Sequence, residues 1–270
     1  MEMEGKKLLN NIKLFVLDLD GTFYLGGRLF DGSLRFLERV RNSGRKFIFF
    51  TNNSSRTPEY YIGKLNKMGA QVGRADIVTS GDVCIDYLNK NHAGASVFLM
   101  GTGALHESFA AAGVQLFDTE EDITATPDVV VAAFDTELTY HKLERACTYI
   151  RNGAVFLATH EDINCPTEEG FIPDCGAMCA AIGLSTGRKP RYLGKPHPET
   201  VEKVESLTGV PRGEIAFIGD RLYIDVACGV QNGATGILVL SGETKIEDIK
   251  DSPVKPHAVF SDLGEIADLI

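Results

Sequence analysis

The sequence predicts an α/β fold: a doubly wound parallel sheet with a second α/β domain inserted into it. Three observations support this prediction. Short apolar runs alternate with helical patterns at both ends of the chain, several of these runs end in acidic or polar residues, and the middle of the chain has strands and helices of its own. Such alternation is typical of a parallel sheet that carries helices on both faces.

The N-terminal part predicts strand, helix, strand and helix in turn. Residues 14–17 form a continuous apolar run that ends at Asp18, which is typical of a buried parallel strand. Residues 32–43 carry Leu34, Leu37 and Val40 at helical spacing, and residues 46–50 are again apolar. A further helix is expected from Pro58, which suits a first helical position, to Gly69.

The rest of the chain repeats this alternation. In the C-terminal part we expect a helix at 198–207 and strands at 214–219 and 235–240. The middle predicts strands at 96–100, 128–133 and 154–158, with helices at 138–151 and 175–186. Because this middle part can bury a core by itself, we expect a core domain of residues 1–81 and 189–270 and an inserted domain of residues 82–188. The hinges of the inserted domain would be residues 79–81 and 185–188. The chain of 270 residues is long enough for both domains.

Polar side chains gather at the expected carboxyl ends of the core strands or in the loops that follow. They are Asp18 and Asp20, Thr51 and Asn52, Lys195, and Asp220 and Asp225. The carboxyl ends of the strands in an open parallel sheet meet at one crevice, so these groups are expected to form one site. Four carboxylates in one crevice repel each other and a phosphate, which requires compensating positive charge. Lys195 and Mg²⁺, an ion that prefers oxygen ligands, would supply it.

These residues resemble the four motifs of the haloacid dehalogenase (HAD) superfamily of phosphohydrolases, in the right order. The motifs are Asp-Leu-Asp-Gly-Thr at 18–22, Thr51-Asn52, Lys195, and Gly219-Asp220 with Asp225. Segments 50–54, 79–82, 138–140, 166–170 and 194–196 also resemble the NagD-like branch, called p-nitrophenylphosphatase-like as well. That branch carries a large α/β (C2-type) cap between the second and third motifs of a Rossmann-like core. The resemblance covers nearly the whole chain.

The resemblance implies a catalytic role for each motif residue. Asp18 would attack phosphorus, and Asp20 would protonate the leaving oxygen and then deprotonate the hydrolytic water. Thr51 and the amide of Asn52 would hydrogen-bond the phosphoryl group, while Lys195 would neutralise charge. The implied ligands of Mg²⁺ are the Asp18 carboxylate, the Asp20 backbone carbonyl and the Asp220 carboxylate, with Asp225 orienting waters or Lys195 from behind them.

Two residues of the expected cap are further candidates for substrate binding. His160 follows a cap strand at a position where this branch usually has Asn, and Asp174 lies in a later cap loop. Two interpretations stay open for each: a contact with the substrate, or a merely solvated side chain.

Composition limits the partners. The formal net charge is −10, without a basic stripe, which argues against a nucleic-acid or anionic-membrane partner. No apolar stretch approaches the roughly 20 residues of a spanning helix, and the start lacks a signal-peptide pattern, so we expect a cytoplasmic protein. The six cysteines are expected to be reduced. The oligomeric state is left open, and the cap offers a surface on which a homodimer can form.

The resemblance implies a small phosphorylated metabolite as substrate. Nucleoside monophosphates, sugar phosphates, phosphoglycolate, pyridoxal phosphate and p-nitrophenyl phosphate all fit, and the residues do not choose among them. Two other functions remain open. A receiver-like signalling protein also uses an Asp phosphoacceptor, although Asp20 and the inserted domain argue against it. A catalytically silent sensor of phosphorylated ligands would be distinguished by binding without turnover.

Overall fold

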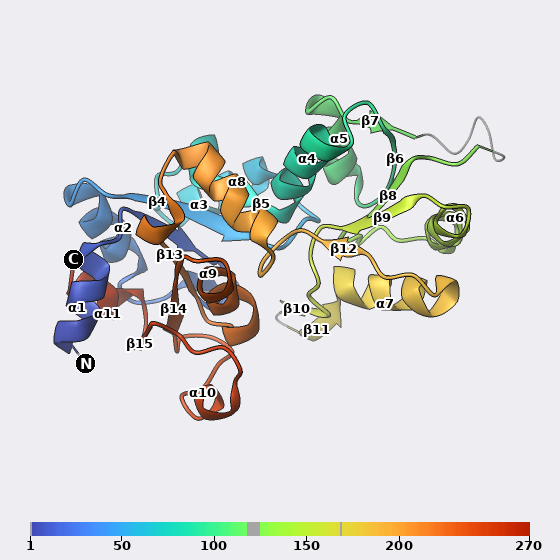
Figure 1. Cartoon of the computed structure of the whole chain (residues 1–270). Coiled ribbons are helices and arrows are strands. Elements are labelled where there is room, and N and C mark those ends of the chain that lie inside the picture. The colour runs from blue at the N-terminus through green and yellow to red at the C-terminus, as the bar shows by residue number, and fades with distance from the viewer. Residues whose placement is uncertain (1, 118–124, 168) are drawn as a thin grey trace. The chain divides into compact units, whose positions relative to one another are not determined.

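The computed structural model describes residues 2–117, 125–167 and 169–270. The chain divides into two compact units, shown in Figure 1. The first comprises Met1–Thr51, Pro58–Val78 and Lys195–Ile270, and the second comprises Asn52–Thr57 and Thr79–Gly194. The residues expected to form the inserted domain, 82–188, lie within the second unit. The chain passes between the units next to two predicted site residues, since Thr51 and Lys195 are the last and first residues of their segments.

The first unit is built on a six-stranded sheet in the order β15-β14-β13-β1-β4-β5. Its strands are β1 (Leu14–Leu17), β4 (Lys46–Thr51), β5 (Ile77–Thr79), β13 (Ile215–Gly219), β14 (Thr235–Val239) and β15 (Ala258–Phe260). The chain winds outward in both directions from the parallel pair β1 and β13, with β4 on one side and β14 on the other. This is the predicted doubly wound sheet, and its switch point lies where β1 and β13 end.

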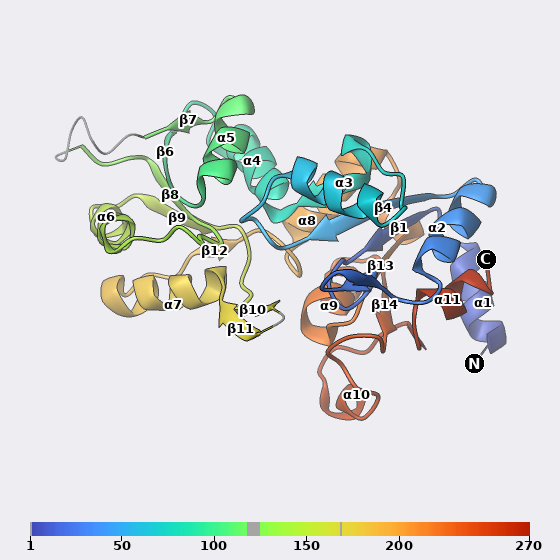
Figure 2. The ribbon, with the colours of Figure 1, turned by 180° about the vertical axis from the view of Figure 1, so that it is seen from behind.

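Helices cover both faces of this sheet (Figures 1 and 2). One face carries α2 (Ser33–Asn42), α3 (Pro58–Lys67) and α11 (Leu263–Ala267), and the other carries α8 (Pro198–Thr208) and α9 (Ala227–Gln231). The helix α1 (Glu2–Asn10) lies beside α11, and its Leu9 joins the same core cluster as Leu263. In α2 the buried apolar side chains are Phe36, Leu37 and Val40, and the Phe36 ring meets Phe15 of β1 edge-on at 5.4 Å. Leu34, which the helical spacing placed on the core side, is 39% exposed. Phe36 fills the core instead.

The second unit has a parallel sheet of its own, in the order β12-β9-β8-β6-β7. Its strands are β6 (Ser96–Met100), β7 (Gln115–Leu116), β8 (Val129–Ala132), β9 (Val155–Ala158) and β12 (Arg191–Tyr192). The helices α6 (Tyr140–Arg151) and α7 (Cys175–Thr186) cover one face, opposite α4 (Ser80–Asn91) and α5 (Gly103–Ala111) (Figure 1). An antiparallel hairpin of β10 (Asn164–Thr167) and β11 (Gly170–Pro173) precedes α7.

The expected hinge at residues 79–81 has regular structure, and one short element was not predicted. Residues 79–81, expected as a hinge, end β5 and begin α4, because Thr79 and Asp82 form a capping box at the start of this helix. A two-stranded hairpin, β2 (Tyr24–Leu25) and β3 (Arg28–Leu29), follows the first motif and was not predicted. The remaining short helix is α10 (Asp248–Asp251).

Two expectations from composition can be compared with the fold. Within the described ranges, no helix is both long and apolar enough to cross a membrane. None of the six cysteines, all of which the structure describes, forms a disulfide. Cys175 and Cys179 lie one turn apart in α7 with their sulfur atoms 3.9 Å apart, in the helix that the sequence predicted.

Candidate active site

The structure places six of the predicted residues in the first unit, at or just beyond the carboxyl ends of its central strands. Asp18 and Asp20 follow β1, Thr51 is the last residue of β4, and Asp220 follows β13. Asp225 lies in a single π-helical turn, Leu222–Val226, and Lys195 begins the last segment of the unit. Since β1 and β13 are neighbours, Asp18 and Asp220 end adjacent strands of the sheet.

Lys195 contacts two of the acidic residues of this site. Its Nζ lies 2.6 Å from Asp18 Oδ1 and 2.6 Å from Asp225 Oδ1, and it donates to the Phe50 carbonyl oxygen at 3.3 Å. Only 3% of the Lys195 side chain is exposed. Burial lowers the pKa of Lys195, but the two carboxylates outweigh burial and the net shift is upward. Lys195 is therefore a fixed cation between two acids from distant parts of the chain.

The three carboxylates of Asp18, Asp220 and Asp225 offer oxygen atoms that all lie within 4.8 Å of one another. Lys195 contacts two of these groups, and the charge of Arg221 also acts on Asp18 and Asp220. Burial raises the pKa of Asp18 to about 8, with Lys195 opposing and Asp225 adding to the shift. Burial, followed by the charge of Asp225, raises the pKa of Asp220 to about 6. These raised pKa values show that the nearby cations do not offset the burial and mutual repulsion of the carboxylates, and a bound divalent cation would favour their ionised forms.

Asp220 is enclosed by two glycines that leave no room for side chains. A Cβ atom on Gly21 would lie 2.4 Å from Asp220 Oδ2, and one on Gly242 would lie 2.0 Å from the same oxygen. Gly21 also has a φ of +84°, which a residue with a side chain adopts at a cost. The backbone amide of Glu243 donates to Asp220 Oδ2 at 2.7 Å. These close approaches hold the Asp220 carboxylate in one place.

Asp20 has surroundings different from those of Asp18. The Tyr24 hydroxyl, on the unpredicted β2–β3 hairpin, lies 3.5 Å from Asp20 Oδ2, and Lys64 Nζ stacks 3.7 Å from the centre of the Tyr24 ring. Burial raises the pKa of Asp20, and the charge of Lys64 opposes this shift. A raised pKa suits a carboxyl group that has to deliver a proton. Tyr24 and Lys64 therefore help to set the environment of Asp20. The sequence did not predict either residue, because no motif or periodic pattern around them indicates this role.

Asn52 is built into the second unit, although its neighbour Thr51 belongs to the first. Its side-chain Nδ2 donates to Asp162 Oδ1 at 3.0 Å, and its carbonyl oxygen accepts from Ser80 Oγ at 2.5 Å. Thr51 is 5% exposed at the end of β4. The predicted contacts of both residues with a phosphoryl group stay a prediction.

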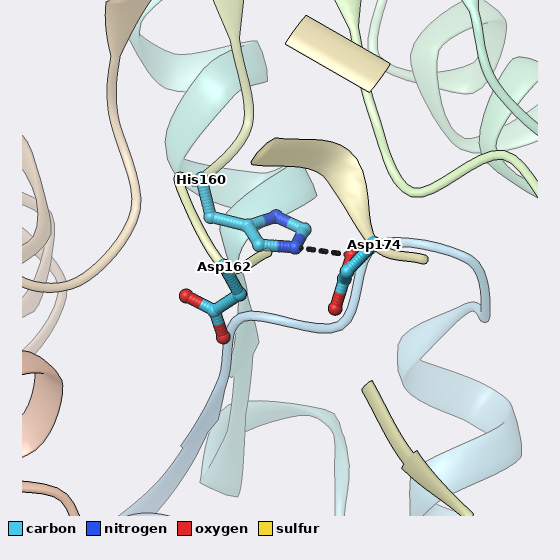
Figure 3. Close-up of side chains that lie close together, drawn as sticks. All are labelled: His160, Asp162 and Asp174. Atoms are coloured by element: carbon cyan, nitrogen blue, oxygen red, sulfur yellow. Dashed lines mark hydrogen bonds and ion pairs between the residues drawn. The ribbon is translucent and has the colours of Figure 1, made fainter. Parts of the chain in front are cut away.

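His160 and Asp174 form a buried pair in the second unit (Figure 3). His160 Nε2 lies 2.8 Å from Asp174 Oδ1, and the two side chains are 0% and 5% exposed. The alternative of solvated side chains is therefore wrong for both. Asp162, which the sequence analysis did not single out, lies beside them, and one ligand atom from each of the three falls within 4.8 Å of the others. Substrate binding by His160 and Asp174 stays a prediction.

The donor atoms of the first unit suit magnesium. Its carboxylate oxygens are hard ligands of the kind that Mg²⁺ selects, and Mg²⁺ commonly binds one or two carboxylates together with substrate oxygens and waters. Both Asp225 oxygens are engaged, one by Lys195 and the other by the Arg221 amide at 3.2 Å. Asp18 and Asp220 are therefore the carboxylates best placed to hold the ion, with Asp225 behind them.

Comparison with known proteins identifies the family. Residues 15–115 match a family model described as a haloacid dehalogenase-like hydrolase, and residues 192–266 match one described as HAD-hydrolase-like. An acid sugar phosphatase of Staphylococcus aureus is 34% identical, over 97% of this chain and 99% of its own length. The structure of a 4-nitrophenylphosphatase from Thermotoga maritima is 45% identical with a TM-score of 0.91, covering 97% of this chain and 98% of that one. A glycerol phosphate phosphatase of Mycobacterium tuberculosis, solved in complex with magnesium, is 29% identical with a TM-score of 0.88, covering 96% of this chain and 77% of that one.

The chain belongs to the haloacid dehalogenase-like hydrolases, and its fold is that of this class. Within the class it is a phosphatase of the NagD-like, p-nitrophenylphosphatase-like branch, as its motifs implied. This result favours hydrolysis over the receiver-like and sensor functions that the sequence left open.

Proposed function

We propose that this protein is a Mg²⁺-dependent phosphatase that hydrolyses small phosphomonoesters through an aspartyl-phosphate on Asp18. The observation that carries the proposal is the position of Lys195 Nζ, 2.6 Å from both Asp18 and Asp225, beside the buried Asp220. The proposal assigns catalysis to a core of residues 1–81 and 189–270 and treats residues 82–188 as its inserted cap.

The first step forms a covalent intermediate. An oxygen of Asp18 bonds to phosphorus while the bond from phosphorus to the ester oxygen breaks. Asp20, with a pKa raised by burial, gives its proton to the departing oxygen. Lys195 balances the charge that gathers on Asp18 and the phosphoryl oxygens, helped by Thr51 and the Asn52 amide. The products of this step are the free alcohol and phosphorylated Asp18.

The second step restores the enzyme. Asp20, now ionised, takes a proton from water, the water oxygen bonds to phosphorus, and the bond to Asp18 breaks to release inorganic phosphate. Mg²⁺, when bound by Asp18, the Asp20 carbonyl and Asp220, supplies charge stabilisation for the phosphoryl group. Asp225 holds Lys195 in place throughout.

The proposed substrates are small phosphorylated metabolites. The names of the relatives, which include an acid sugar phosphatase, a 4-nitrophenylphosphatase and a glycerol phosphate phosphatase, support this substrate class. We expect that the protein binds neither nucleic acid nor a membrane. The formation of a homodimer stays a prediction.

Magnesium removal tests the proposed function directly. We expect hydrolysis of p-nitrophenyl phosphate with Mg²⁺, loss of turnover with EDTA, and recovery when Mg²⁺ is added in excess. Phosphate release from nucleoside monophosphates, sugar phosphates, phosphoglycolate, glycerol phosphate and pyridoxal phosphate, compared by kcat/KM, would then rank the substrates. Turnover that persists unchanged in EDTA, or binding of these compounds without any turnover, would contradict the proposal.

Replacing the acid-base residue should slow both chemical steps without removing the metal. For Asp20→Asn we expect kcat to fall by about 10²- to 10⁴-fold, because an amide neither donates nor takes the proton. Mg²⁺ should still bind, since the proposed ligand at this position is the backbone carbonyl oxygen. Calorimetric titration with Mg²⁺ and steady-state kinetics on the same preparation measure the two effects. If this variant lost Mg²⁺ binding, the side chain would be a ligand and the assignment of the carbonyl oxygen would be wrong.

A further inference from the structure

We propose that His160 is a positioning residue of this phosphatase: its doubly protonated ring, paired with Asp174, fixes the two segments of the second unit that continue into Thr51 and Lys195. This inference rests on the proposed function. The positioning role acts through Thr51 and Lys195, separately from any contact of His160 with the substrate, and it starts from the course of the chain.

Two catalytic residues sit beside crossings of the chain between its units. Thr51 is followed by Asn52, and Lys195 is preceded by Gly194. Both neighbours belong to the second unit, and both are held there by residues around His160. A displacement of either neighbour is transmitted to the catalytic residue through one peptide bond.

Asn52 is held at two atoms. Ser80 Oγ donates to its carbonyl oxygen at 2.5 Å, and Asp162 accepts from its side-chain amide at 3.0 Å. Ser54, two residues further along the chain, is also held by hydrogen bonds. Its Oγ lies 3.1 Å from Thr159 Oγ1 and accepts from the Phe134 amide at 3.0 Å. The segment after Thr51 is therefore anchored in the second unit and not left as a loose connection.

Gly194 is held at the same place. Its backbone amide donates to the Thr159 carbonyl oxygen at 2.7 Å. A Cβ atom on Gly194 would lie 2.6 Å from that oxygen, 2.7 Å from Asn52 Oδ1 and 3.0 Å from His160 Cβ. The segments that lead to Thr51 and Lys195 thus pack against each other and against His160.

The hydrogen bonds around His160 determine where its protons lie. The Ser80 hydroxyl donates its hydrogen bond to the Asn52 carbonyl oxygen, and the Thr159 hydroxyl donates to Cys175 Sγ at 3.8 Å. Both hydroxyl oxygens then face His160 Nδ1, at 3.4 and 3.0 Å, and can accept from it. We infer that Nδ1 carries a proton that these two oxygens share.

The other ring nitrogen also carries a proton. His160 Nε2 lies 2.8 Å from Asp174 Oδ1, which already accepts from the Cys175 amide at 2.6 Å. A carboxylate can only accept, so Nε2 donates. With protons on both nitrogens the ring is an imidazolium, and Figure 3 shows it directed at the Asp174 carboxylate.

The charged and titratable groups around this ring favour the imidazolium. They are Asp174 and Asp162, from the N-cap of α7 and the loop after β9, and the Cys175 thiol on α7. Burial lowers the pKa of His160, but these groups outweigh burial and raise it to about 9. The ring therefore keeps both protons at neutral pH, and it loses the Nδ1–H or Nε2–H donor only as the pH rises through about 9.

Three variants test the role in catalysis. His160→Leu removes both donors, and we expect kcat for p-nitrophenyl phosphate to fall by about 10²-fold, the cost of a small displacement of catalytic groups, with KM changed much less. His160→Asn keeps an N–H near the position of Nδ1 and should recover most of that loss. His141→Leu, at an exposed histidine of the same unit, is the matched control and should behave as the wild type.

The pH profile separates positioning from general damage to the fold. In the wild type the imidazolium is fully present at neutral pH and is lost above about 9, so kcat should decline there. The Asn variant has no titrating ring and should lack that decline. Two variants of Ser80 test the role if His160→Leu does not fold. Ser80→Ala should lower kcat, and Ser80→Thr, which keeps the hydroxyl, should restore it.

Nuclear magnetic resonance of ¹⁵N-labelled histidine gives a readout that is independent of activity. Both nitrogens of His160 should carry protons at pH 7, including in the Asp18→Asn variant. A neutral ring at pH 7, or an active wild type whose turnover is unchanged in His160→Leu and Ser80→Ala, would overturn the inference alone. A folded wild type without Mg²⁺-dependent turnover would instead overturn the proposed function, and the positioning role with it.

Discussion

Replacing Asp18 by Asn should abolish turnover while leaving the protein folded. The amide cannot form the aspartyl-phosphate, and loss of a catalytic nucleophile costs on the order of 10⁶-fold in kcat in a comparable covalent enzyme. Asn has nearly the same shape as Asp, and Lys195 keeps its contact with Asp225 at 2.6 Å. We therefore expect a loss of at least about 10⁴-fold in kcat. No phosphate should remain on the protein after an acid quench.

The same variant has a signature in stability. Because the pKa of Asp18 rises from 3.8 to about 8 on folding, ionisation of this carboxyl opposes folding of the metal-free protein. Its contribution to the free energy of unfolding should fall as the pH increases from about 4 to 8. Asp18→Asn should lack this contribution and be at least as stable at pH 8 in EDTA.

Urea unfolding at several pH values, with exposed Asp251→Asn as the control, measures this signature. Measurable phosphorylation or undiminished turnover in Asp18→Asn would contradict the mechanism. A large loss of stability at pH 8 would contradict the electrostatic account of the site.

Replacing Lys195 by Met should damage both activity and stability. Met nearly matches the volume of the side chain, but it leaves Asp18 and Asp225 buried without their shared cation. Breaking a buried pair in this way costs about 3–5 kcal/mol in the free energy of unfolding. We expect kcat to fall by at least about 10²- to 10³-fold, the cost of losing one preorganised donor to developing charge.

Two measurements check this expectation. Urea unfolding in EDTA gives the free energy, and assays at saturating Mg²⁺ give kcat, with Lys67→Met, at an exposed lysine of the same unit, as the control. The loss of stability should shrink with Mg²⁺ present, because the ion supplies part of the missing positive charge. Equal kcat in the two Met variants would show that Lys195 is not part of the catalytic machinery.

Much of the fold could be predicted because its signals are local. The run at 14–17 is apolar on both faces, as a central parallel strand must be, and it became β1 with every residue buried. The helix at 175–186 was predicted to the residue, since Asp174 caps its start and Gly187 ends it in the left-handed region. The motif residues could be placed at strand ends for the same reason.

Contacts between distant segments could not be predicted in this way. Leu34 and Phe36 are both apolar and two residues apart, so only the packing of α2 against Phe15 decided which of them is buried. Tyr24 reaches Asp20 through a hairpin of two-residue strands, which is too short to leave a periodic pattern. Asn52 and Asp162 are 110 residues apart in the sequence and nevertheless share a hydrogen bond.

The sequence by itself indicated the class of protein, because Asp18, Asp20, Lys195 and Asp220 resemble the haloacid dehalogenase motifs in type and order. Only the tertiary structure decided which charges neutralise each other. It gave Lys195 two acids and paired His160 with Asp174, since burial and the approach of distant segments set these pairings. The periodicity of the sequence does not indicate these pairings.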